Sequence, residues 1–126
     1  MDTRRDGVIL IVDDDEAIRE ALQMALVTEG YETALAAHGE EALAWLGTHP
    51  VPGLVLLDLM MPVMDGWQVI DQLRQTGRLF EVPIVVITAF GRELGSATGL
   101  PLLRKPIELS TLMSVVDENC RAATPP

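Results

Sequence analysis

The chain has 126 residues, of which 48% are hydrophobic and only 4% are aromatic. This length fits one ordinary domain that buries roughly two-thirds of its unfolded surface, and the composition is that of an ordered chain with an aliphatic core. A formal net charge of −10 argues against nucleic acid or an anionic membrane as a direct partner. The apolar runs are too short for a secretory leader or a membrane span, and the single cysteine excludes an internal disulfide.

The first half of the chain alternates between strand and helix patterns. A short apolar run at 8–12 predicts a strand that stops at three consecutive aspartates, and apolar residues at helical spacing predict a helix over 16–29. Gly30 is expected to end that helix. Alternating apolar residues predict a second strand over 31–37, and a short helix is expected over 39–47.

The second half repeats the alternation. A strongly apolar run at 54–59 predicts a strand that is buried on both faces, and a helix is expected over 65–77. Two more apolar strands are expected at 82–89 and 100–107, and an amphipathic stripe predicts the last helix over 109–120. Five strands alternating with helices indicate an α/β domain with a parallel sheet.

Polar side chains stand where the predicted strands end. Parallel strands bring their carboxyl ends to one edge of the sheet, and ligands of such sheets bind beyond that edge. The chemically interesting residues at or just after these strand ends are Asp13, Asp14, Asp58, Thr88 and Lys105. We therefore expect them to converge on one site.

The expected chemistry follows from the charge of that site. A lone carboxylate in an apolar strand, such as Asp58, costs several kcal/mol unless it is neutralised or paired. Two carboxylates about 4 Å apart repel by roughly 4 kcal/mol at an effective dielectric constant of about 20. Carboxylates, one carbonyl and water, without His or Cys, favour Mg²⁺. A carboxylate beside Mg²⁺ can attack phosphorus and form an aspartyl phosphate, with Lys105 and Thr88 binding phosphoryl oxygens.

Four segments carry a family resemblance. "ILIVDDDE", "LVLLDLMMPVMDG", "VVITA" and "KP", in this order, resemble the landmarks of the receiver domain of two-component response regulators. The resemblance covers essentially the full chain. It implies a (βα)₅, flavodoxin-like fold, a doubly wound five-stranded parallel sheet. It also implies that the domain receives phosphate from a histidine kinase or phosphotransfer protein.

The resemblance implies a role for each site residue. It makes Asp58 the phosphoacceptor and a magnesium ligand, Asp14 a direct magnesium ligand and Asp13 a ligand through water. Met60 would contribute its backbone carbonyl to the metal. The two remaining positions match the switch hydroxyl and the phosphate-binding lysine of the family, and these are Thr88 and Lys105.

One segment departs from the family pattern. Residues 89–100 contain three glycines and no sustained apolar stripe, and an isolated segment this short is a poor helix. We therefore expect the fourth helix to be short or missing. Leu102 stands three residues before Lys105, where the family often has Tyr or Phe. These departures in 89–102 leave open a receiver-like interaction module whose output does not depend on phosphorylation.

A third hypothesis is a small magnesium-dependent phosphohydrolase. It lacks a second acid two residues after Asp58, where Met60 stands, so it has no obvious general acid. The chain is therefore expected not to be an enzyme, beyond catalysing its own phosphorylation and dephosphorylation.

Several polar residues also have structural interpretations. The acids at 13–15 could cap the first helix, which suits Asp15 best, and Asp65 is expected to cap a later helix. His38 and His49 are interpreted as loop residues off the site edge, not as ligands.

The expected organisation is one domain over 1–126. Its ordered core is expected at about 6–121, with a tail or linker stub at 122–126. No segment after the last helix is long enough for a DNA-binding domain, so we expect either a single-domain regulator or a fragment of a longer protein. The expected output partner is a downstream effector protein or domain. The single cysteine suits the cytoplasm, and neither direct nucleic-acid binding nor a membrane is expected.

Overall fold

Five parallel strands form one sheet, in the order β2-β1-β3-β4-β5. The computed structural model describes residues 7–89 and 98–120. The strands are β1 (Val8–Val12), β2 (Glu32–Ala36), β3 (Leu54–Asp58), β4 (Ile84–Thr88) and β5 (Leu102–Arg104). All five predicted strands are therefore confirmed. The bounds of β1 are as predicted, those of β2, β3 and β4 are slightly shorter, and β5 is much shorter than the predicted 100–107.

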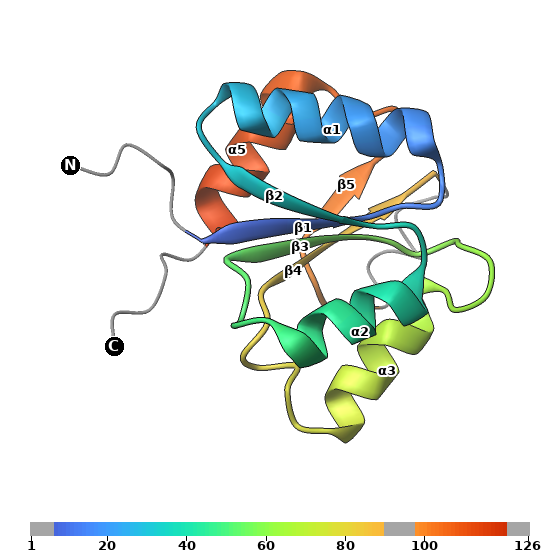
Figure 1. Ribbon diagram of the computed structural model, residues 1–126. Helices are drawn as coiled ribbons and strands as arrows, with labels where there is room; N and C mark the ends of the chain where they lie inside the picture. Colours follow the sequence, from blue (N-terminus) through green and yellow to red (C-terminus); the bar gives the residue numbers. More distant parts are fainter. Residues whose placement is uncertain (1–6, 90–97, 121–126) are drawn as a thin grey trace.

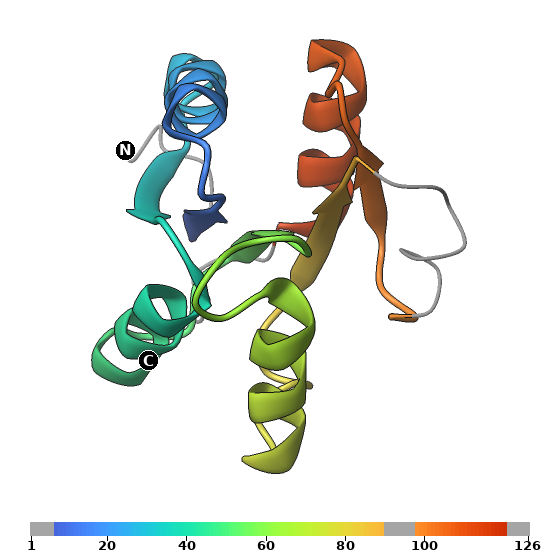
Figure 2. The same cartoon turned by 90° about the vertical axis from the view of Figure 1, so that its right-hand side faces the viewer.

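Helices cover both faces of this sheet. The described residues contain α1 (Glu16–Thr28), α2 (Gly39–Thr48), α3 (Gly66–Gln75) and α5 (Leu109–Asn119). Figures 1 and 2 show α1 and α5 on one face and α2 and α3 on the other. This arrangement confirms the predicted doubly wound α/β fold.

Two expectations concern parts of the chain outside the described residues. The short or missing fourth helix is expected in 89–100, of which residues 90–97 are not described, and the expected tail is 122–126; both stay predictions. Among the described helices, none combines the length and the apolar character that a bilayer crossing requires.

The sheet is buried because it packs between two aliphatic clusters. Successive residues of a strand point to opposite faces. Leu10 and Val12 of β1 therefore join the cluster beneath α2 and α3, while Ile9 and Ile11 join the cluster beneath α1 and α5. This explains why the central strands are continuous apolar runs and not alternating ones.

Local hydrogen bonds set the helix boundaries. Asp15 caps α1 by accepting two backbone N–H groups, and Asp65 forms a capping box with Gln68 at the start of α3. Gly30 follows α1 with a φ of 92°, which confirms it as the residue that stops the helix. His38 lies in the loop between β2 and α2, as interpreted, but the expectation that it lies off the site edge is wrong. It follows β2 at the carboxyl edge and caps α2, since its Nδ1 accepts a backbone N–H of the first turn.

Candidate functional site

The register of the sheet places Asp13 and Asp58 beside each other. Val12 of β1 pairs with Leu57 of β3, so the next residue of each strand lies at the carboxyl edge. Both side chains are buried, with exposed fractions of 0% for Asp13 and 3% for Asp58. The strand order changes direction between β1 and β3, which is where doubly wound sheets bind ligands.

Lys105 directly follows the edge strand β5, and its side chain contacts both of these carboxylates. Its Nζ lies 3.0 Å from Asp13 Oδ2 and 3.1 Å from Asp58 Oδ2. The backbone fixes its starting point, because the Lys105 N–H donates to the Thr88 carbonyl at 2.9 Å. One ammonium group therefore compensates part of the charge of two buried acids.

Backbone donors hold the other oxygens of the pair. Asp13 Oδ1 accepts the N–H of Asp15 at 2.9 Å, and Asp58 Oδ1 accepts the N–H of Met60 at 3.1 Å. Besides its ion pair with Lys105, the buried Asp13 Oδ2 accepts no hydrogen bond from the residues that the structure describes. That oxygen retains unused capacity to accept a hydrogen bond or bind a cation.

The surroundings shift the pKa values of the site. Burial raises the pKa of Asp58 from 3.8 to about 6, and the charge of Asp13 adds to this rise. The Met60 N–H and Lys105 oppose it without cancelling it. For Lys105, burial lowers the pKa, but the close contact with Asp13 and the charges of both carboxylates raise it by more, so the net shift is upward from 10.5. The lysine therefore stays charged at neutral pH.

Three acids fit a hard divalent cation. Asp13, Asp14 and Asp58 each offer one carboxylate oxygen, and these oxygens lie within 4.8 Å of one another. Asp14 is exposed, so it faces solvent from which a hydrated ion can arrive. An all-oxygen donor set, together with the open capacity of Asp13 Oδ2, fits Mg²⁺.

Thr88 reaches the same edge from the neighbouring strand. It ends β4 and is fully buried, and it pairs in register with Arg104, directly before Lys105. Met60 is the second residue after β3 and is about half exposed. The structure thus gathers at one edge all six residues singled out in the sequence, which are Asp13, Asp14, Asp58, Met60, Thr88 and Lys105.

Two further residues support the site, and neither role was predicted from the sequence. The Arg19 guanidinium donates to the Asp13 carbonyl at 2.8 Å. Gly66, interpreted only as part of a helix start, packs so closely that a Cβ there would lie 2.5 Å from the Asp58 carbonyl oxygen. Neither contact has a local sequence signal, because both depend on how α1 and α3 pack on the sheet.

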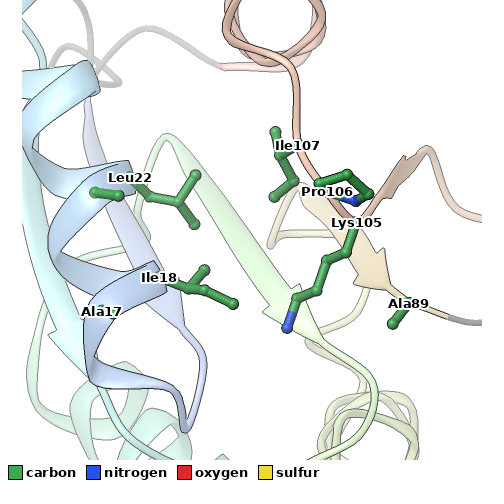
Figure 3. A pocket seen from close by; sticks show the side chains of 8 residues that line it. Ala17, Ile18, Leu22, Ala89, Lys105, Pro106 and Ile107 are labelled. Carbon is green, nitrogen blue, oxygen red and sulfur yellow. The ribbon is translucent and has the colours of Figure 1, made fainter.

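An apolar pocket opens beside Lys105. Its volume is about 540 Å³, and it lies between α1 and the segment that follows β5. Figure 3 shows Ile18 and Leu22 on one side, Pro106 and Ile107 on the other, and the Lys105 ammonium pointing into the space between them. The charged cluster is therefore bordered by a surface on which apolar groups of a partner could pack.

The fold and this edge define a class of protein: a doubly wound α/β domain with a lysine-bridged acidic site at the switch point. Within this class, the family model described as "Response regulator receiver domain" matches residues 9–117. The chain belongs to the response regulator receiver domain family.

Curated relatives and solved structures agree with this family. The chain is 40% identical over 125 residues to the response regulator MprA of Mycolicibacterium vanbaalenii, covering 93% of this chain and 52% of the relative. It is 43% identical over 94 residues to the probable transcriptional regulator ycf27 of Porphyra purpurea, covering 75% of this chain and 37% of the relative. The chain thus spans about half the length of these relatives, or less.

Two solved structures show the same fold. The receiver domain of the Francisella response regulator 1452 aligns with a TM-score of 0.80 at 26% identity, covering 90% of this chain and 95% of that one. The chemotaxis response regulator CheY4 of Vibrio cholerae aligns with a TM-score of 0.79 at 29% identity, covering 90% of this chain and 98% of that one.

Proposed function

We propose that this receiver domain is a phosphoacceptor that takes a phosphoryl group onto Asp58. The donor is a phosphohistidine of a sensor histidine kinase or phosphotransfer protein. A bond forms between an Asp58 carboxylate oxygen and phosphorus while the histidine N–P bond breaks, and the imidazole leaves. The observation that carries this proposal is the buried Asp58 carboxylate held between Asp13 and Lys105.

The contacts of Asp58 suggest which oxygen reacts. Oδ1 is engaged by the Met60 N–H, whereas Oδ2 faces the Lys105 ammonium. We assign the attack to Oδ2, after which Lys105 exchanges its carboxylate contact for a phosphoryl oxygen. Thr88 then supplies a hydroxyl for another phosphoryl oxygen.

The donor set also supports a magnesium requirement. Asp13, Asp14, Asp58 and the backbone carbonyl of Met60 would hold the ion. When bound, Mg²⁺ supplies neutralisation of the charge that the phosphoryl oxygens bring to an already acidic site. Apart from catalysing its own phosphorylation and dephosphorylation, the domain is proposed to have no enzymatic activity.

The proposed output is a change in a protein–protein surface that a downstream effector protein or domain reads. The names of the relatives, a response regulator and a probable transcriptional regulator, support such an effector. Direct contact with nucleic acid is not proposed for this acidic domain. The proposed donor and the single cysteine fit the cytoplasm.

The test is phosphate incorporation from acetyl phosphate, followed by intact mass. Wild type should gain one phosphoryl group with Mg²⁺ and almost none with a chelator, and Asp58→Asn should gain none. Equal incorporation by Asp58→Asn would show that the acceptor is another residue. Equal incorporation of phosphate with Mg²⁺ and with a chelator would overturn the metal assignment.

One observation favours the second candidate, an interaction module with a phosphorylation-independent output. Leu102 in β5 packs against the core and has neither a ring to rotate nor a hydroxyl to exchange partners. Incorporation without any effect on effector binding would support this candidate.

A further inference from the structure

The N-terminus of α2 is hydrogen-bonded to the loop that follows Asp58 and packs closely against it. Gly39, the first residue of α2, donates its N–H to the Met64 carbonyl at 2.9 Å. A Cβ on Gly39 would lie 2.5 Å from that carbonyl oxygen and 2.6 Å from Val69 Cγ2 in α3. A backbone carbonyl cannot turn away like the end of a long side chain, so this approach requires glycine.

This loop, residues 59–65, contributes backbone groups to the candidate site. Its Met60 N–H donates to Asp58, and its Met60 carbonyl is the proposed metal ligand. Within the loop, Val63 has a φ of 67°, which β-branched residues avoid. The Val63 side chain is 71% exposed, so its own packing does not impose this conformation. The conformation must be held by contacts of the neighbouring backbone.

Those contacts come from two helices. At the end of the loop, the Gly66 N–H donates to the Leu59 carbonyl at 3.1 Å, and Gly66 packs on the Asp58 backbone. One residue before the end of the loop, the Gly39 N–H of α2 donates to the Met64 carbonyl and holds the loop to α2. α2 contributes no side chain to the charged cluster, yet it fixes the loop that does.

We propose that Gly39 is a positioning residue for phosphoryl transfer. By holding Met64, it keeps residues 60–64 in the conformation in which the Met60 N–H donates to Asp58 and the Met60 carbonyl would serve as the proposed metal ligand. The chemical consequence rests on the proposed function, whereas the effect on the loop does not. The position of α2 therefore sets the geometry of the phosphorylation site.

The experiment compares two glycine substitutions on the same helix. Gly39→Ala places its Cβ against the Met64 carbonyl, whereas a Cβ at Gly47 meets nothing within 4 Å. Gly39→Ala should slow phosphorylation by acetyl phosphate roughly tenfold or more, since small displacements at a reacting centre have effects of this size. It should also weaken Mg²⁺ binding and shift the Met60 amide resonance. Gly47→Ala should match wild type in all three measurements.

A second control separates positioning from lost stability. Leu26→Ala removes a buried side chain from the cluster on the opposite face of the sheet, so it should lower the melting temperature without touching the loop. Assayed at a temperature where every variant is folded, Leu26→Ala should keep the wild-type rate. Adding Val69→Ala to Gly39→Ala removes one of the three close contacts and should restore part of the rate.

The outcomes distinguish this inference from the proposed function. A wild-type rate, Mg²⁺ affinity and Met60 resonance in Gly39→Ala would overturn the positioning role. If wild type itself takes no phosphate, the proposed function fails, but the Met60 resonance and Mg²⁺ titration still test the loop. If Gly39→Ala and the double variant both fail to fold, Gly39 is structural only and the inference is wrong.

Discussion

At the scale of single residues, the notable feature is that Lys105 only partly compensates two buried acids. It contacts one oxygen of each, at 3.0 and 3.1 Å. Removing the Lys105 ammonium would leave two uncompensated buried charges, which costs several kcal/mol. With the ammonium in place, the acids still lie close to one another and partly repel. The net negative charge of the site therefore favours the binding of a further cation. The pH dependence of stability should show the repulsion between the two acids.

The raised pKa of Asp58 predicts how stability depends on pH. Between pH 3.8 and about 6, folded Asp58 holds a proton that the unfolded chain has released. Its contribution to stability therefore falls as the pH rises through this window, by on the order of 1 to 2 kcal/mol. Asp58→Asn, which is always neutral, should raise the free energy of unfolding of metal-free protein at neutral pH, and the gain should vanish near pH 4.

Denaturant titrations with a chelator at several pH values measure this difference. Asp14→Asn is the matched control. Asp14 is exposed, so its substitution should change the free energy of unfolding by less than Asp58→Asn. A gain for Asp58→Asn that is independent of pH would contradict the raised pKa.

Lys105→Met should have the opposite effect on stability. It removes the ammonium from Asp13 and Asp58 while keeping the length of the side chain. We expect the free energy of unfolding of metal-free protein to fall by about 3 kcal/mol at neutral pH. Because Mg²⁺ replaces part of the lost charge, it should stabilise Lys105→Met more than wild type. Thermal melts with and without Mg²⁺ measure this, and equal stabilisation of the two proteins would contradict it.

At the scale of elements, the first residue of α3 packs directly against the site. α3 begins on the Asp58 backbone through Gly66, and its capping box fixes that start. Asp65→Ala removes the side chain that accepts the Gln68 N–H at 3.0 Å, and it should cost about 1 kcal/mol. Asp71→Ala, an exposed acid later in the same helix, is the control and should cost less. Chemical denaturation of both variants decides between a cap and a general loss of charge.

Which elements and roles the sequence could predict depends on the range of the interactions. Asp15 and Asp65 were predictable as caps because a cap is a contact between near neighbours in sequence. The convergence of Asp13 and Asp58 was predictable because parallel strands end at one edge. The cap of α2 by His38 was missed because imidazole is an uncommon cap. The contact of Gly39 was missed because it depends on how two helices and a loop pack together.

At the scale of the whole molecule, the sheet separates two core clusters that share the same strands. Leu26 is fully buried on the α1 and α5 side, and Leu46 is 2% exposed on the α2 and α3 side. Each Leu→Ala change should cost about 2 to 5 kcal/mol. The two losses should add in the double variant, because the sheet lies between the sites. Urea unfolding followed by circular dichroism measures this, and a large deviation from additivity would contradict independent packing.

The parallel topology has a consequence for quality control. Asp13 and Lys105 follow the first and fifth strands and Asp58 ends the third, and Lys105 meets Asp58 across 47 positions of sequence. A chain that is still emerging from the ribosome, or one that has lost its last strand, has no ammonium beside its acceptor. On the proposed function, only a finished molecule could then be loaded with a phosphoryl group. Phosphorylation would then depend on complete folding, because a receiver domain without its last strand would not be phosphorylated.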